Sequence, residues 1–275
     1  MSARLEAIYR KILSGGAVIH VTAEEAQIPA VRSAVAEFVA RNKLAPLCPR
    51  PVMTADRAAS LLKLTEFEGE QTQADGKDKH IEEIFVIPGS VAFDAKCCGS
   101  SPINTKESVA DQVFAHCLSM TDLWDKVRTK GGAYGVFFIP QSLTETSYFV
   151  TYRDPKPILS LSALSDSMSD EKTSVFTDEE VEKAITGCYS SEITPETPSL
   201  KGARGFLWLF TGGSNEKREC RVGYLLDISK EDLTASCLRY RENFDKDSSV
   251  AILCPRSIMD DKVVESTGKI IVLPL

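Results

Sequence analysis

Apolar segments of β-strand length occur in this chain as pairs, and helical patterns separate the pairs. The pairs lie at residues 81–87 with 90–98, 133–139 with 147–152, and 250–254 with 269–273. A parallel sheet would need a helix after each strand, whereas strands in blocks are typical of α+β folds. The sequence therefore predicts a two-layer α+β structure, in which helices pack on one face of a mostly antiparallel sheet.

Turn signals predict how the strands within two of these pairs are joined. Pro88 and Gly89 lie between the first two segments and predict a hairpin. The polar residues 140–146 join the next two, and Asp154 and Pro155 end the second of them. A meander is therefore expected over this part of the chain.

Helix signals are present on both sides of the strands. Helices are expected over residues 3–13, from about Pro29 to Asn42, and over 105–130. Gly15 and Gly16 end the first of them, and a strand is expected directly afterwards at 17–21. Two later helix starts carry a capping box, in which a carboxylate follows a hydroxyl three residues later: Thr177 with Glu180, and Ser229 with Asp232.

The composition is that of an ordinary soluble globular protein, with 43% hydrophobic and 26% charged residues. A chain of 275 residues can bury one large core. No linker-like gap separates two complete patterns, so a single domain over residues 1–275 is expected. The polar stretch Glu68–Lys79 is interpreted as a mobile surface loop.

Charge and hydropathy exclude two classes of partner. The chain has 32 basic and 39 acidic residues, a net charge of −7, and no cluster of lysine and arginine. Nucleic acid is therefore not an expected partner. No apolar run reaches the roughly 18 to 20 residues that a membrane span requires, and the N-terminal segment lacks the core of a signal peptide.

The cysteines do not indicate a disulfide framework. Eight are present, at positions 48, 97, 98, 117, 188, 220, 237 and 254. They include no Cys-x-x-Cys pair, and the adjacent Cys97 and Cys98 cannot easily bridge each other. Most are interpreted as reduced core thiols.

The histidines do not form a metal site by their spacing. His20 falls within a strand-like segment, and His116 lies beside a cysteine on a helix, where neighbours point about 100° apart. Glu83 follows His80 as in the zinc motif His-x-x-Glu-His, but Ile84 takes the place of the second histidine. No nucleophile elbow, Walker A loop or Gly-x-Gly-x-x-Gly is present. We therefore expect no metal ligands and no complete active site in this chain.

The segment RTKGGAYG, residues 128–135, joins a helical pattern to a strand-like one. Gly131 and Gly132 take positive φ at little cost, so a plain helix-to-strand turn would explain them. The flanking residues favour another interpretation, a turn that faces a substrate. These flanks are DLWDKV before the segment and, after the next strand pair, TYRDP at 151–155.

With these flanks the segment resembles the C-terminal domain of the presequence protease and falcilysin-like branch of the pitrilysin/insulysin metallopeptidases. The matching elements are the Val127-Arg128 step at a helix end, Gly-Gly-Ala-Tyr-Gly at 131–135, and Tyr-Arg-Asp-Pro at 152–155. The order and spacing of the other helices and strands extend the likeness to nearly the whole chain. The resemblance implies a pitrilysin-like domain from the end of a longer protease.

In proteases of this family two halves enclose a chamber, and the N-terminal half holds zinc through His-x-x-Glu-His. The resemblance implies that Arg128 and Tyr134 are catalytic residues, which stabilise the negative charge on the scissile carbonyl oxygen. It also implies that Arg128, Gly131, Gly132, Ala133 and Tyr134 bind the substrate. Because the zinc motif is absent here, zinc is expected in an N-terminal half, on the same or a separate chain.

The resemblance thus predicts the substrate-binding, non-zinc C-terminal part of a zinc metalloendopeptidase that degrades short unstructured peptides. This chain alone is not expected to be active. The alternative is a non-catalytic pitrilysin-like structural or peptide-binding subunit. The expected partners are the zinc-bearing half and an unstructured peptide, and the resemblance places the protein in the mitochondrial matrix or a related organelle.

The remaining residues near the segment are assigned structural roles. Arg153 and Asp154 are expected to support the turn before Pro155 through a salt bridge. Trp124 and Tyr148 are expected in the core or half-buried on the sheet.

Overall fold

The computed structural model describes residues 2–44, 81–169, 176–210, 213–258 and 269–272. The chain divides into two compact units. The helical unit comprises Met1–Phe67 and Pro195–Gly212, and the sheet unit comprises Glu68–Thr194 and Gly213–Leu275. The predicted mobile loop, Glu68–Lys79, lies outside the described residues.

The sheet unit is built on a six-stranded sheet with the strand order β3-β4-β2-β5-β1-β6. The strands are β1 (Ile81–Val86), β2 (Phe93–Gly99), β3 (Gly135–Gln141), β4 (Thr146–Tyr152), β5 (Ser249–Cys254) and β6 (Lys269–Val272). The pairs β3–β4, β4–β2 and β2–β5 are antiparallel, and only β5–β1 and β1–β6 are parallel. The predicted α+β fold with a mostly antiparallel sheet is confirmed.

One of the two predicted hairpins forms and the other does not. β3 and β4 pair directly, with Phe137 opposite Val150. β1 and β2 do not pair, because β5 lies between them and pairs with both. The hairpin predicted from Pro88 and Gly89 was therefore wrong. Alternate residues of β5 are buried, including Val250 and Ile252, so this strand gains more by a central place than at an edge.

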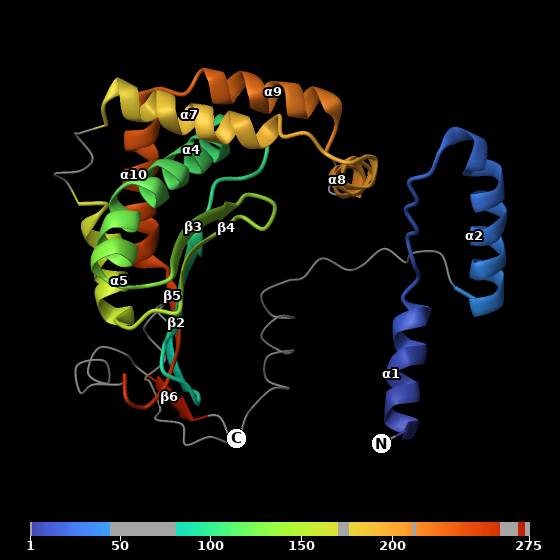
Figure 1. Cartoon of the computed structure of the whole chain (residues 1–275), viewed down its shortest axis with the longest axis horizontal. Helices are drawn as coiled ribbons and strands as arrows, with labels where there is room; N and C mark the ends of the chain where they lie inside the picture. The colour runs from blue at the N-terminus through green and yellow to red at the C-terminus, as the bar shows by residue number, and fades with distance from the viewer. Residues whose placement is uncertain (1, 45–80, 170–175, 211–212, 259–268, 273–275) are drawn as a thin grey trace. The chain divides into compact units, whose positions relative to one another are not determined.

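Helices cover one face of the sheet (Figure 1). α4 (Lys106–Met120) packs on β3, α10 (Lys230–Lys246) packs on β2, and α5 (Pro157–Asp166) packs on β2 and β4. α7 (Asp178–Glu192) and α9 (Asn215–Leu226) form an outer layer on α4. Both predicted capping boxes are present: Thr177 with Glu180 starts α7, and Ser229 with Asp232 starts α10.

The long helix predicted over 105–130 is interrupted. α4 ends at Met120, where Thr121 leaves helical geometry with φ −114° and ψ −95°. The chain then resumes as η3 (Trp124–Lys130), a π-helical segment, which carries the start of the motif toward β3. A π-helical turn widens the helix and changes the direction of its side chains.

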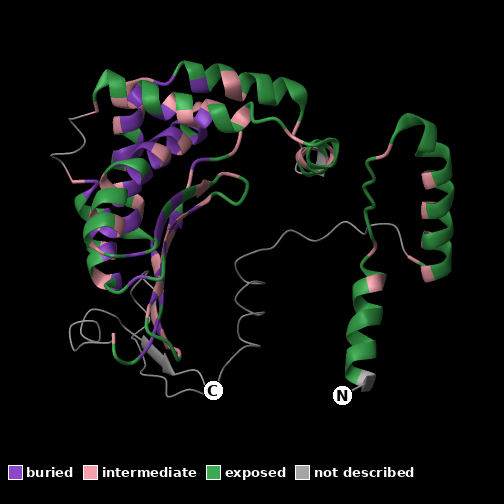
Figure 2. Cartoon of the chain, viewed as in Figure 1, coloured by how far each residue is buried: buried purple, intermediate pink, exposed green. Residues whose placement is uncertain are grey.

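Buried residues gather where the helices face the sheet (Figure 2), and an aromatic cluster is part of this core. Phe114 of α4 stacks on Tyr240 of α10 at 5.9 Å between ring centroids, and Phe138 of β3 meets Tyr240 edge-on at 4.9 Å. The Tyr240 hydroxyl lies 2.7 Å from Ser147 Oγ, so this buried polar group is satisfied. This cluster fixes β3 and β4 against α4, next to the motif.

The other face of the sheet presents the residues that alternate with the buried ones. Phe137 is 50% exposed and Tyr152 is 43% exposed, and Ile139 and Leu253 are exposed as well. Successive side chains of a strand point to opposite faces, so these four belong to the face that the helices leave uncovered. The predicted arrangement with helices on one face is therefore confirmed.

The helical unit contains α1 (Ser2–Ser14), η1 (Glu25–Gln27), α2 (Ile28–Asn42) and α8 (Pro198–Phe210). Both predicted N-terminal helices are present. The strand predicted at 17–21 is wrong, because only Ala17 is in a β-bridge and the residues after it lie against α8. The His20 ring lies 5.3 Å from the Phe206 ring, and Thr22 approaches Gly202 so closely that a Cβ would not fit there.

Candidate functional site

The glycines of the 128–135 segment shape a tight turn between η3 and β3. Gly132 has φ +89°, a conformation that residues with a side chain rarely adopt. Gly131 has an ordinary φ of −73°, but a Cβ there would collide with the carbonyl oxygen of Val127. Two backbone hydrogen bonds of 3.1 Å close the turn, from Gly132 N to Arg128 O and from Ala133 N to Val127 O. Both glycines are therefore required by the backbone itself.

Tyr134 is fixed through its backbone and presents its side chain to solvent. Its N–H donates to the carbonyl oxygen of Tyr152 at 3.0 Å and lies 3.4 Å from that of Arg153. Ala133, directly before it, is buried. The Tyr134 side chain is 66% exposed, and its ring meets that of Tyr152 edge-on at 5.8 Å. The phenol is thus held on a rigid strand junction and remains accessible.

Arg128 is oriented by a neighbouring aromatic ring. Its guanidinium lies 4.0 Å from the centroid of Trp124, which precedes it by four residues on η3. Stacking of this kind holds a guanidinium in place, while its N–H groups stay free to donate hydrogen bonds in the plane of the guanidinium. Trp124 is 41% exposed and lies on a helix, so the expectation that it is a core or sheet residue was wrong.

Arg153 directly follows β4 and lies near two aromatic rings of the site, although it does not line the pocket itself. It has φ +52°, in the left-handed region, and its guanidinium carbon lies 5.5 Å from the Tyr152 centroid and 6.0 Å from that of Tyr134. The predicted salt bridge with Asp154 does not form. Asp154 is fully buried instead, and its Oδ1 accepts a 2.7 Å hydrogen bond from Lys156 N.

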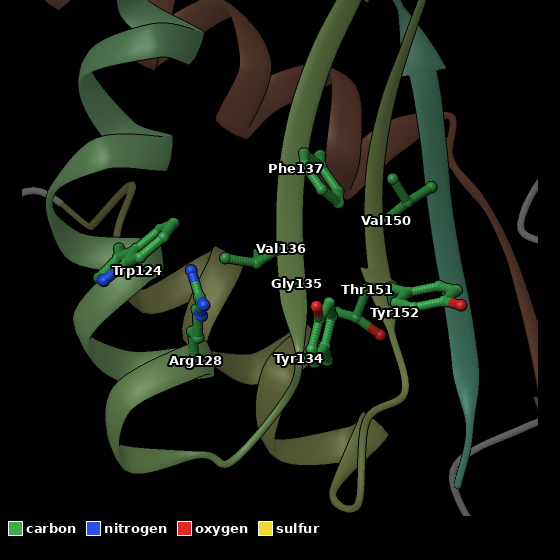
Figure 3. A pocket seen from close by; sticks show the side chains of 9 residues that line it. All are labelled: Trp124, Arg128, Tyr134, Gly135, Val136, Phe137, Val150, Thr151 and Tyr152. Carbon is green, nitrogen blue, oxygen red and sulfur yellow. The ribbon is translucent and has the colours of Figure 1, made fainter.

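Arg128 and Tyr134 line a pocket of about 610 Å³ formed by η3, the start of β3 and the end of β4 (Figure 3). Its lining residues are Trp124, Arg128, Tyr134, Gly135, Val136, Phe137, Val150, Thr151 and Tyr152. Of these, Arg128 alone carries a charge at neutral pH, and most of the others are aromatic or aliphatic. The pocket therefore combines an apolar wall with a guanidinium and a phenol as donors.

The predicted site residues fall into two groups, those that line the pocket and those that form the turn. Arg128 and Tyr134 line the pocket, whereas Gly131, Gly132 and Ala133 form the turn behind it and are not among the lining residues. Their role in substrate binding stays a prediction.

Of the nine lining residues, the sequence predicted only Arg128 and Tyr134 as site residues, and the aromatic residues that it missed are Trp124, Phe137 and Tyr152. The i,i+4 spacing of Trp124 and Arg128 on one helix face, and strand alternation for the other two, are the signals that would have found them.

The described residues contain no group of three or more histidine, cysteine, aspartate or glutamate side chains that could hold a metal ion. His20 packs on Phe206, and the His116 ring packs on Gly187, where burial lowers its pKa. His80 lies outside the described residues. Within the described part of the chain, no helix is both long and apolar enough to cross a bilayer.

Comparison with known proteins identifies relatives that share this part of the chain. The chain is 29% identical over 191 residues to the mitochondrial presequence protease of Schizosaccharomyces pombe, a match that covers 68% of this chain and 19% of that protein. It is 27% identical over 234 residues to the chloroplastic/mitochondrial presequence protease 1 of Arabidopsis thaliana, covering 84% of this chain and 20% of that protein. The chain therefore spans about a fifth of the length of these relatives.

Solved structures share the fold at lower identity. A peptidase M16 inactive domain from Pseudomonas fluorescens superposes with a TM-score of 0.53 at 14% identity, over 82% of this chain and 51% of that chain. A protease from Helicobacter pylori gives a TM-score of 0.53 at 16% identity, over 81% and 52%. At this identity the likeness concerns the fold alone.

A family model described as "PreP C-terminal domain" matches residues 82–248, which is more than half of the chain. The matched range runs from β1 to the end of α10 and includes the turn, the pocket and both glycines. This chain belongs to the PreP C-terminal domain family.

Proposed function

We propose that this chain is the substrate-binding, non-zinc C-terminal part of a zinc metalloendopeptidase that degrades short unstructured peptides. One observation carries the proposal: Arg128 and Tyr134 line the same apolar pocket, in a chain of the PreP C-terminal domain family. The relatives named presequence protease are about five times longer than the part that matches. Zinc and its ligands therefore belong, in this proposal, to an N-terminal half outside this sequence.

The chemistry of the pocket suits the carbonyl side of a peptide bond under attack. Negative charge develops on the carbonyl oxygen when water adds to the carbon. The phenol of Tyr134 and the guanidinium of Arg128 are donors that stabilise such an oxygen, and the apolar wall excludes water that would compete. Zinc held by the partner half would supply the activated water. In this proposal the chain binds and orients the peptide and lowers the barrier.

The proposed location follows the relatives. The proteins from Schizosaccharomyces pombe and Mus musculus are named mitochondrial presequence proteases. We infer the same compartment, the mitochondrial matrix or a related organelle, for this chain.

A second candidate is a non-catalytic peptide-binding or structural subunit of the same fold. The uncovered sheet face favours it, because Phe137, Tyr152 and their neighbours could hold an extended apolar segment without any chemistry. Under this candidate, peptide binding depends on the aromatic residues and no rate depends on the Tyr134 hydroxyl.

The deciding experiment mixes this chain with a zinc-bearing N-terminal half of a family protease and follows cleavage of a quenched fluorescent peptide. We expect cleavage in the mixture alone, with kcat reduced by about 10²-fold or more in Tyr134→Phe and Arg128→Ala. The matched controls are Tyr224→Phe and Arg256→Ala, which change an exposed tyrosine and arginine outside the pocket. Unchanged kcat in both pocket variants, with assembly intact, would contradict the proposal and favour the second candidate.

A further inference from the structure

Two aspartates lie buried directly behind the pocket. Asp94 on β2 is 2% exposed and Asp154, two residues after β4, is 0% exposed. The Thr151 hydroxyl donates to Asp94 Oδ1, and Lys156 N donates to Asp154 Oδ1 at 2.7 Å. Each aspartate thus has one oxygen satisfied by a donor close by in the fold.

The second oxygen of each carboxyl has no such donor. Asp94 Oδ2 and Asp154 Oδ2 are buried without a hydrogen-bond partner among the described residues. The bridge between Ala92 and Asp154 places Asp154 opposite a residue two positions from Asp94, so both aspartates share one face of the sheet. Two ionised carboxylates have only acceptors and repel each other. One proton between them converts one carboxyl into a donor and satisfies both oxygens at once.

The surroundings of the pair are largely apolar. The charge of Asp154 acts on the Asp94 carboxyl and raises its pKa. The apolar cluster at this end of the sheet includes Ile252 and the Cys254 thiol from β5, and α5 contributes Ile158 and Leu161 to it.

Three cations lie within two residues of the pair in sequence. Arg153 and Lys156 are exposed. Lys96, on the same face of β2 as Asp94, is half-buried, and its ammonium lies 5.3 Å from the Phe244 ring centroid.

The pair is joined to the pocket through the 152–155 turn. Asp154 exchanges two 2.8 Å backbone hydrogen bonds with Ala92, and this bridge secures the turn to the segment before β2. The carbonyl oxygen of Tyr152, at the start of the same turn, accepts the Tyr134 N–H. A displacement of Asp154 would therefore shift the strand end that holds Tyr134.

We propose that Asp94 and Asp154 share one proton, and that this proton-bound pair is a positioning device that holds the 152–155 turn and, through it, Tyr134 at the pocket. The relevance of the pair to peptide binding rests on the proposed function, whereas the shared proton does not.

The pair makes stability depend on pH in a defined window. Burial, and next the charge of Asp154, raise the pKa of Asp94 from 3.8 to about 8, although the Thr151 hydrogen bond lowers it in part. Between these two values the folded state keeps a proton that the unfolded state has lost, so stability falls as pH rises. Below the lower value the contribution of the pair is fully present, and above the upper value its loss is complete.

The first test reads the proton directly. The infrared C=O stretch of a protonated carboxylic acid should be present in the folded chain at about pH 6, where exposed carboxyls are ionised. Asp94→Asn replaces the shared proton by an amide donor of the same shape and should remove this band. Asp154→Asn replaces the other carboxyl of the pair and should also remove the band. It is the variant to use if Asp94→Asn does not fold. A band absent from the wild type, or unchanged in both variants, would overturn the proposal.

The second test reads the position of Tyr134 without any peptide. Hydrogen exchange of the Tyr134 amide reports opening of the 152–155 turn. Relative to Asp94→Asn, the wild-type protection factor should fall by up to about tenfold per pH unit between the two pKa values. Asp245→Asn, which removes an exposed carboxylate on α10, should follow the wild type. Equal pH dependence in the wild type and Asp94→Asn would refute the positioning role, even if the peptidase proposal stood.

Discussion

At the scale of residues, the arginines near the site are oriented by aromatic rings, and Tyr134 is fixed by its backbone hydrogen bonds. Arg128 lies over Trp124, and Arg153 lies near the rings of Tyr134 and Tyr152. Such contacts fix a guanidinium without consuming its donors, which a salt bridge would do. The arrangement leaves positive charge available to a ligand in an otherwise apolar pocket.

Removal of the Trp124 ring should weaken binding through Arg128. We expect Trp124→Leu to cost about 0.5–1 kcal/mol of peptide-binding free energy, the usual worth of an exposed cation–π contact. Isothermal titration with a peptide that the wild type binds would measure this. Trp208→Leu, in the helical unit, is the matched control and should bind as the wild type does. The Trp124→Leu substitution is also made in the Arg128→Ala variant. If it loses as much binding free energy there as in the wild type, the ring acts independently of Arg128.

The two turn glycines should differ sharply from other glycines of the chain. Gly132→Ala should lower the free energy of unfolding by about 1–2 kcal/mol, because its φ is +89°. Gly131→Ala should cost at least as much, since its Cβ would meet the Val127 carbonyl. Gly223→Ala on α9, where a Cβ meets nothing within 4 Å, should stabilise by up to about 1 kcal/mol. Urea denaturation of the three variants checks this order.

At the scale of elements, the predictions that were confirmed depend on local signals, whereas the order of the strands depends on long-range pairing. The capping boxes of α7 and α10 and the β3–β4 hairpin depend on residues close in sequence, and all are present. The insertion of β5 between β1 and β2 joins segments more than 150 residues apart, and no local pattern encodes it. For the same reason the sequence could not show that Asp94 and Asp154 meet.

The candidate site was predictable to a similar degree. Arg128 and Tyr134 lie on either side of a glycine turn that resembles a known motif, and both line the same pocket. Their catalytic role stays a prediction. Trp124 was misjudged, because the predicted continuous helix hides the change to π-helical geometry after Thr121. That change sets the direction of the tryptophan and arginine side chains.

The start of α7 offers a direct test at this scale. Thr177 and Glu180 cap each other's backbone, at 3.2 Å from Glu180 N to Thr177 Oγ1 and 2.9 Å from Thr177 N to Glu180 Oε2. We expect Thr177→Ala to lower the free energy of unfolding by about 1 kcal/mol, and Thr177→Ser to change it little. Thermal unfolding by circular dichroism would measure both. A similar loss in the serine variant would point to a role of the methyl group.

At the scale of the whole molecule, the described core lies entirely in one unit. Every residue described as buried belongs to the sheet unit, whereas none described in the helical unit is buried. Burial of apolar surface is the main source of stability, so the helical unit has less of its own. The prediction of one domain over 1–275 is therefore best tested by following the two units separately.

The chain offers one tryptophan for each unit, Trp124 in the sheet unit and Trp208 in the helical unit. With Trp208→Phe and Trp124→Phe as single-tryptophan reporters, we expect the Trp208 signal to change at lower urea than the Trp124 signal. Phe114→Ala, which empties the core of the sheet unit, should shift the Trp124 midpoint by the equivalent of about 3–5 kcal/mol. If the units unfold independently, the Trp208 midpoint stays where it was. Coincident midpoints that move together would instead establish one cooperative domain over the whole chain.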